Sequence, residues 1–179
     1  MKSLSSDYTI RSFQETDMPL LGSLYQAVTE RDHAVFWWVG EPSNWNNVYC
    51  AFDKDQMIGK GQIEVVSAIQ PDQPADHKHA LYINIKTIPE RENDISLLEA
   101  LYQPLLTRAV EWKKTLSAAH ETMLCIGNHS TETANTSFFL QKGYDYLNSL
   151  FHMERDLQQP VPEFALSEGL QWQYWKMAA

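Results

Sequence analysis

Stretches in which hydrophobic and polar side chains alternate predict four β-strands in the first half of the chain. A short polar turn, Asp53-Lys54-Asp55-Gln56, separates the second stretch from the third and predicts a hairpin. Pro89 ends the fourth stretch, because proline has no backbone N–H to give to a sheet. The four stretches are residues 8–13, 48–52, 57–66 and 80–88.

Apolar residues at three- and four-residue spacing predict three helices. Thr16 or Asp17 can cap the first helix, and Pro19 lies in its first turn, where the missing N–H costs nothing. The second pattern contains Pro104, and a proline inside a helix costs on the order of 3 kcal/mol, so we expect a kink or a break there. The third helix is predicted over residues 131–142, with Gly143 ending it. The apolar positions are Leu20, Leu21, Leu24 and Val28 in the first helix and Leu97, Leu98, Leu101, Leu105, Ala109, Trp112 and Leu116 in the second.

The last third of the chain predicts further strands. Residues 123–127 form a short apolar run that is typical of a buried strand, and residues 146–156 predict one or two more. Pro160 and Pro162 then form a stiff connector to residues 170–175, where apolar and polar side chains alternate again. We expect this tail strand to pair with a sheet edge, either in its own chain or across a homodimer.

Length and composition limit the class of protein. A chain of 179 residues, 44% of them hydrophobic, can bury the core of one domain but is too short for two ordinary ones. The formal net charge of -9 argues against nucleic acid or an anionic membrane as a partner, since both attract basic faces, and it leaves cationic substrates such as amines open. We expect one α/β domain over residues 1–157, followed by a connector and an extra strand over residues 158–179.

The termini and the cysteines predict a reducing, cytoplasmic compartment. The first ten residues lack the apolar stretch of a signal peptide, and no apolar run approaches the roughly 18 residues of a membrane span. Cys50 and Cys125 each lie inside an apolar run and are predicted to be buried thiols. His77 and His79 have the spacing of a metal pair, but no third ligand is evident, so no metal is expected.

Four segments occur in the order in which they are found in the GNAT N-acetyltransferase superfamily, and together they resemble it over about residues 8–157. Ile10-Arg11 followed by Asp17 is similar to the opening strand and helix of the family. The hairpin VYCAFDKDQMIGKGQIEVV is similar to its second and third strands. INIKTIPERENDISLLEALYQPLL takes the place of its cofactor motif, and SFFLQKGYDY resembles its late helix.

The resemblance implies a GNAT fold, which has a mixed, mostly antiparallel central sheet flanked by helices. It implies that strands 80–88 and 123–127 are parallel and splayed at the cofactor cleft. It also implies that an acetyl group is transferred directly from acetyl-CoA to a small amine. Two alternatives stay open: a degenerate domain that binds a ligand or partner without catalysis, and descent from a tandem GNAT protein, whose linker the tail resembles.

The cofactor motif departs from the family pattern of Arg or Gln, two residues, Gly, one residue, and Gly or Ala. Arg91 matches, but Asp94 and Ser96 replace both small residues, and their side chains obstruct close approach of the backbone to a pyrophosphate. Asp94, or Ser96 with Glu99, can instead cap the following helix. The resemblance assigns cofactor binding to Ile85, Thr87, Arg91, Glu92, Asn93, Asp94, Ile95 and Ser96.

Acid–base candidates follow from the same resemblance. Glu64 and His79 are candidates for the general base, and Tyr144 is a candidate for the acid. Phe139 stands where many family members carry the catalytic tyrosine, and it cannot donate a proton. Alternatively, Glu64 is a solvent-facing strand residue, His79 belongs to a polar loop, and Tyr144 is a core aromatic.

The irregular stretch at residues 32–47 corresponds to the acceptor side in the family. Trp37, Trp38 and Glu41, with Trp45, are candidates for a pocket that binds an apolar amine, in part through cation–π contacts. The alternative is that these aromatic side chains pack the stretch onto the core.

Overall fold

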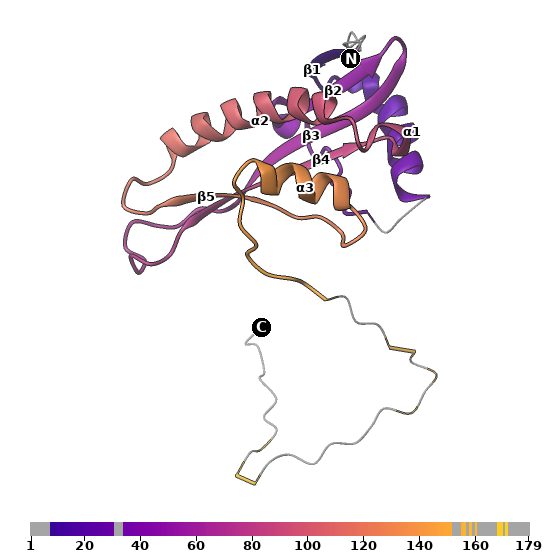
Figure 1. The fold of residues 1–179 in the computed structure, drawn as a ribbon. Helices are drawn as coiled ribbons and strands as arrows, with labels where there is room; N and C mark the ends of the chain where they lie inside the picture. The colour runs from indigo at the N-terminus through magenta and orange to yellow at the C-terminus, as the bar shows by residue number, and fades with distance from the viewer. Residues whose placement is uncertain are drawn as a thin grey trace, which may run out of the picture. The chain divides into compact units, whose positions relative to one another are not determined.

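The computed structural model describes residues 8–30 and 34–151, together with residues 155, 156, 158, 160, 168, 169 and 171 (Figure 1). The chain divides into two units, Met1–Asp145 and Tyr146–Ala179. The fold described below is that of the first unit. The predicted tail strand lies outside the described residues except for Gln171, and so do residues 152–154 of the strands predicted after the third helix.

The first unit is built on a five-stranded sheet whose strands follow one another in sequence order. Neighbouring strands are antiparallel except β4 and β5, which are parallel. The sheet is therefore mixed and mostly antiparallel, as predicted. The strands are β1 (Thr9–Ser12), β2 (Val48–Asp53), β3 (Gln56–Ser67), β4 (His79–Thr87) and β5 (Thr122–Ile126).

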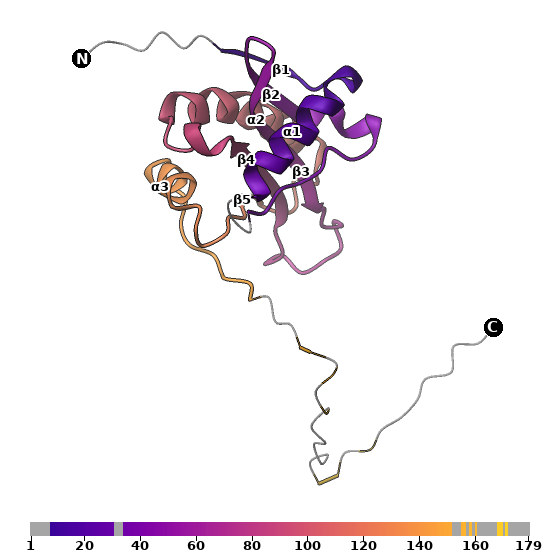
Figure 2. The ribbon, with the colours of Figure 1, turned by 90° about the vertical axis from the view of Figure 1, so that its right-hand side faces the viewer.

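Helices cover both faces of the sheet, as Figures 1 and 2 show. α1 (Met18–Thr29) packs in one hydrophobic cluster with residues of β2, whereas α2 (Ile95–Thr115) and α3 (Thr133–Gln141) pack in a second cluster with residues of β3 and β4. α2 connects β4 to the parallel β5, and such a crossover is the usual connection of parallel strands. Short 3₁₀ turns complete the unit at Glu15–Asp17, Pro42–Asn47 and Pro89–Arg91.

The start of α1 differs in detail from the prediction. Asp17 stands at the N-cap position, but its carboxylate makes no hydrogen bond to the helix. It binds the guanidinium of Arg11 through two contacts of 2.6 and 2.7 Å and accepts the backbone N–H of Gln14. The Arg11 guanidinium lowers the pKa of Asp17. The pair therefore holds β1 to the entry of the helix.

α2 is a single helix that continues through Pro104, so of the two alternatives expected there, a kink or a break, the break does not occur. Leu101 and Leu105, on either side of the proline, are fully buried against β3. Because packing anchors both halves to the same strand, it outweighs the local cost of the proline.

α2 approaches β3 closely because two residues of the strand have no side chain. A Cβ atom at Gly61 would lie 2.8 Å from a methyl carbon of Leu105, and one at Gly59 would lie 3.0 Å from a methyl carbon of Leu101. Both distances are shorter than ordinary carbon–carbon contacts. The two glycines therefore set the distance between helix and sheet.

The opposite face of the sheet carries a buried row of polar side chains. Lys60, Gln62 and Asn84 are at most 2% exposed. Lys60 and Gln62 are two positions apart in β3, so their side chains lie on the same face of the sheet. Lys60 Nζ donates to Gln62 Oε1 at 2.7 Å and to the carbonyl of Trp37. Burial lowers the pKa of Lys60 to about 7.

The cover of this row is residues 34–39, which we call the covering segment. Asn84 accepts the N–H of Trp37 at 3.3 Å and donates to the carbonyl of Val35 at 2.7 Å. Gln62 donates to the carbonyl of Trp38 at 3.2 Å. The segment is thus attached by side chains of β3 and β4 and not by a backbone ladder.

Residues beyond α3 differ from the prediction of further strands. Gly143 has a φ of +85° and follows the helix as predicted. Tyr146–Phe151, however, form no strand, and Tyr146 and Phe151 are 75% and 85% exposed. No packed surface holds their side chains in an alternating arrangement. Cys50 and Cys125 are buried free thiols, as expected, and burial raises the pKa of Cys50 to about 12.

The contact between α2 and β3 predicts opposite effects for two glycine substitutions. Gly61→Ala places a methyl group against Leu105 and should lower the free energy of unfolding by about 1–3 kcal/mol. Gly22→Ala, inside α1 with open space at its Cβ position, should raise it by about 1 kcal/mol. Urea unfolding of both variants tests this, and an equal effect of the two would contradict the packing argument.

Lys60 predicts a pH dependence of stability. The unfolded chain has a lysine of ordinary pKa, 10.5, and binds a proton that the folded chain releases above about pH 7. The free energy of unfolding should therefore rise between pH 7 and 10.5, with about 5 kcal/mol as the upper limit for Lys60. Lys60→Met should lack this rise, whereas Lys114→Met, on the exposed surface of α2, should keep it. Parallel pH profiles of wild type and Lys60→Met would refute the assignment.

Candidate active site

The candidate site lies where β4 and β5 part. Their pairing begins at His79 and Thr122 and ends at Ile83 and Ile126. β4 continues to Thr87, while the chain after β5 turns away toward α3. The last four residues of β4 therefore have no strand partner on the β5 side, as the predicted splay requires.

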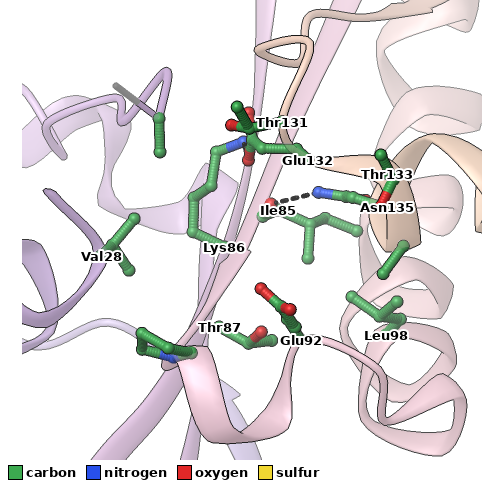
Figure 3. Close-up of a pocket in the computed structure, with 13 residues that line it drawn as sticks. Val28, Ile85, Lys86, Thr87, Glu92, Leu98, Thr131, Glu132, Thr133 and Asn135 are labelled. Carbon is green, nitrogen blue, oxygen red and sulfur yellow. Dashed lines mark hydrogen bonds and ion pairs between the residues drawn. The ribbon is translucent and has the colours of Figure 1, made fainter. Parts of the chain in front are cut away.

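A cavity of about 70 Å³ opens at this place (Figure 3). Its wall comes from the end of β4, the start of α3, the turn before α2 and the C-terminal end of α1. A volume of this size corresponds to about two molecules of liquid water. The residues that line it are Val28, Ala34, Ile85, Lys86, Thr87, Pro89, Glu92, Leu98, Thr131, Glu132, Thr133, Ala134 and Asn135.

A buried ion pair joins the two sides of the cavity. Lys86 of β4 donates to Glu132, the N-cap residue of α3, and Figure 3 shows the lysine side chain reaching across to the glutamate. The other carboxylate oxygen of Glu132 accepts the N–H of His129 at 2.6 Å. Burial lowers the pKa of Lys86, and the charge of Glu132 opposes that shift. The pair places one fixed ammonium and one fixed carboxylate at the cavity.

Asn135 offers the cavity an unused hydrogen-bond acceptor. Its Nδ2 donates to the carbonyl of Ile85 at 2.8 Å, and because a carbonyl only accepts, this bond fixes the orientation of the amide. Its Oδ1 is buried and is the one buried side-chain nitrogen or oxygen without a partner among the residues that the structure describes. Buried polar atoms are nearly always satisfied, so this oxygen can accept from a donor outside the chain, either an ordered water or a ligand.

Asp94 caps α2 and also forms an ion pair with Arg91, the arginine of the cofactor motif. Its Oδ1 accepts the N–H of Leu97 at 3.0 Å, and its Oδ2 accepts from Arg91 Nε and Nη2 at 3.0 and 2.6 Å. Ser96 is not the cap, and Glu99 pairs with Lys142. The helix amide and the guanidinium that an anion would use are therefore both bound to one carboxylate.

The predicted cofactor residues lie at or beside the cavity. Ile85, Thr87 and Glu92 line it. The others, Arg91, Asn93, Asp94, Ile95 and Ser96, form the turn and first residues leading into α2. Lys86, Glu132 and Asn135 are lining residues that sequence reasoning missed. A lysine in a strand rich in apolar residues was the available signal for Lys86.

The predicted acid–base residues do not line the cavity. Glu64 accepts from Gln62 and Asn44 in the row beneath the covering segment. His79 lies at the other end of β4, 1% exposed, where Nδ1 accepts the N–H of Ile69 and Nε2 donates to the carbonyl of Ser117. Both ring nitrogens are therefore used within the fold.

Tyr144 belongs to an aromatic cluster beside α2 and α3. Its ring lies 5.1 Å from that of Phe139, and its hydroxyl lies 3.3 Å from that of Tyr102. Burial raises the pKa of Tyr144 above its ordinary value. The hydroxyl therefore stays protonated and does not act as a base.

The predicted substrate residues lie in and after the covering segment. Trp37 and Trp38 bind the polar row through their backbones, and the half-exposed ring of Trp38 packs on Tyr25 at 5.9 Å. Glu41 is exposed before the 3₁₀ turn. Trp45 packs edge-on against Phe13 at 5.3 Å, which is the core-packing alternative.

Two further searches of the described residues gave negative results. Within residues 8–30 and 34–151 and the few described positions that follow, no group of three or more His, Cys, Asp or Glu could hold a metal ion. No helix in that same part of the chain has the length and hydrophobicity needed to cross a membrane.

Comparison with known proteins identifies the fold. No protein-family model and no curated protein sequence matches the chain, whereas solved structures do match it. YncA of Salmonella typhimurium, solved with its cofactor acetyl-CoA, is 12% identical, covers 78% of this chain and 80% of its own, and has a TM-score of 0.52. The ribosomal-protein-alanine N-acetyltransferase of Brucella melitensis is 15% identical, with 78% and 86% covered and a TM-score of 0.51. An integron cassette protein of V. cholerae, 12% identical with 84% and 94% covered, also has a TM-score of 0.51. At such low identity the likeness is one of three-dimensional arrangement, and it shows that the chain has the fold of the GNAT acetyltransferases.

Proposed function

We propose that the chain is an N-acetyltransferase that transfers an acetyl group from acetyl-CoA to a small amine. The observation that carries this proposal is the cavity beside the unpaired end of β4, whose wall includes Asn135, a residue with a buried acceptor that has no partner in the chain. The thioester arm of acetyl-CoA contains two amide N–H groups that can donate to such an oxygen. An extended arm can also lie along an open strand edge as an added strand does.

The residues at the cavity supply what acyl transfer to an amine requires. Acetyl-CoA supplies an acyl group on a good leaving thiolate. Glu132 is the carboxylate held at the cavity by a backbone N–H, so we assign to it the removal of a proton from the acceptor ammonium. Tyr144 and Glu64 do not line the cavity, so we assign no step to them there. The apolar side chains of Val28, Ile85 and Leu98 exclude water around the reacting groups.

The acceptor side is expected at the covering segment and the residues that follow it. Trp37, Trp38 and Glu41 are the residues that we propose to contact the amine. The ring of Trp38 is half-exposed, and Glu41 carries a negative charge that suits an ammonium. The net charge of -9 favours a cationic acceptor in the same way.

One observation favours the alternative of a domain that binds without catalysis. Asp94 is hydrogen-bonded to Arg91 and to the N–H of Leu97, so neither donor is free for an anion. In addition, Phe139 lacks the hydroxyl of a proton donor. Acetyl-CoA turnover with a panel of small amines separates the two functions. Turnover supports the enzyme, whereas tight binding of CoA without turnover supports the binding domain.

The Asp94 cap predicts weak binding that glycine substitution improves. A cofactor must displace a cap worth about 1 kcal/mol and meet the carboxylates near it, which cost about 1 kcal/mol more at low salt. Together these weaken binding by roughly ten- to thirtyfold. In calorimetric titration with acetyl-CoA, wild-type affinity should improve with ionic strength, and Asp94→Gly/Ser96→Gly should bind more tightly by that factor.

Asp94→Asn is the matched control for this prediction. It keeps a side chain that caps helices well but removes the charge that holds Arg91. Its affinity should lie between those of wild type and the glycine variant. Micromolar wild-type binding that neither variant improves would show that the cap does not oppose the cofactor.

Asn135 predicts a loss of affinity on truncation. Asn135→Ala removes the unpaired acceptor and should weaken acetyl-CoA binding by about tenfold, the equivalent of one buried hydrogen bond. Asn128→Ala removes an exposed amide near α3 that bonds Thr136 and should leave the affinity unchanged. Equal affinities of the two variants would exclude Asn135 from the site.

A further inference from the structure

The cavity contains an amine that belongs to the chain itself. Lys86 is 3% exposed and lines the cavity together with its partner Glu132 (Figure 3). Acyl transfer needs an amine, a group that takes its proton, and an acyl donor within reach. The first two of these are already side by side in the place where the proposed function puts the third.

The carboxylate is held in position independently of the lysine. The second oxygen of Glu132 accepts the N–H of His129 at 2.6 Å, and the residue stands at the N-cap position of α3. Lys86 is fixed at its base by β4, opposite Lys60 in the register with β3. Only the flexible end of the lysine side chain has to move to leave Glu132 and meet a ligand in the cavity.

Protonation of the amine decides whether it can react, because only a neutral amine attacks a thioester. Burial lowers the pKa of Lys86, while Glu132 favours its charged form. Transfer of a proton from Lys86 to Glu132 leaves two neutral groups in the buried site. That removes the cost of keeping two charges away from water.

We propose that Lys86 is an acyl acceptor of this protein and is acetylated by acetyl-CoA bound in the cavity. This inference rests on the proposed function. In the step, Glu132 takes one proton from the ammonium, and Nζ forms a bond to the thioester carbonyl carbon. The C–S bond breaks, and the departing thiolate takes the second proton that the nitrogen loses. The products are Nε-acetyl-Lys86 and free CoA, and no oxidant or reductant is needed.

Lys60 provides an internal control for this proposal. It is also buried and lies directly opposite Lys86 on the neighbouring strand. Its pKa is lowered to about 7, so its amine is neutral in a large fraction of molecules at neutral pH. It is bonded to Gln62 and Trp37 and does not line the cavity. Acetylation that follows amine neutrality alone would modify Lys60, whereas acetylation from the cavity modifies Lys86.

The experiment is incubation of the native full chain with acetyl-CoA, followed by intact mass measurement and peptide mapping. Lys86 should be acetylated at least about tenfold more than Lys60 or the exposed Lys78, because its amine is positioned at the donor. Lys86→Arg, which keeps a cation for Glu132, should lose the added acetyl group, and Lys60→Arg should retain it. Excess CoA without an acyl group should protect Lys86, and chain unfolded in urea should show no preference for it.

The outcomes separate this proposal from the proposed function. Thermal shift with CoA and turnover with amines are measured on the same preparation. Binding or turnover without acetyl-Lys86 overturns the lysine proposal and leaves the function standing. If neither CoA binding nor acetylation is observed, both the lysine proposal and the proposed function are overturned. Acetylation of Lys86 that is no greater than that of Lys60, or that persists in unfolded chain, is non-specific and overturns the lysine proposal alone.

Discussion

The close contact of α2 with β3 is the constraint on which the site depends. Leu101 and Leu105 reach the strand because Gly59 and Gly61 leave room for them. α2 is also the connection between β4 and β5, so its position determines where β5 can start to pair. β5 then has only five residues, which leaves the last four of β4 open at the cavity. A shift of the helix away from the sheet would change the cavity wall at Leu98 as well.

Electrostatics around the cavity are unusual because anionic groups dominate. Glu92 and Glu132 line it, and Asp94 lies at the adjoining turn. The buried cation Lys86 and the half-buried Arg91 each already have a carboxylate partner. An anionic ligand therefore competes with the carboxylates of the chain for both cations. This competition makes ionic strength and the side chain at position 94 the main determinants of affinity.

Local patterns in the sequence predicted the helices and strands of the first unit and their order, but also a strand at residues 146–151 that does not form. Alternation gave the strands, and the turn at Asp53–Gln56 and the cap at Asp94 depend on residues that are close in sequence. The features that were missed depend on distant residues. Lys86 and Glu132 are 46 positions apart, Asn135 bonds a strand 50 positions away, and the burial of His79 comes from Ile69 and Ser117. No local spacing contains these contacts. Pro104 shows the converse, since long-range packing kept a helix whole where local preference predicted a break.

The way in which the covering segment is attached has a consequence for how this fold can change over time. Asn84 binds Val35 and Trp37, two residues apart, much as a neighbouring strand would, but it does so with its side chain. The ladder between β3 and β4 is complete without the segment. Insertions, deletions or substitutions at residues 34–39 therefore leave the backbone pairing of the sheet intact. The segment can diversify in evolution while the sheet is kept, and because Ala34 lines the cavity, such changes also alter the cavity wall.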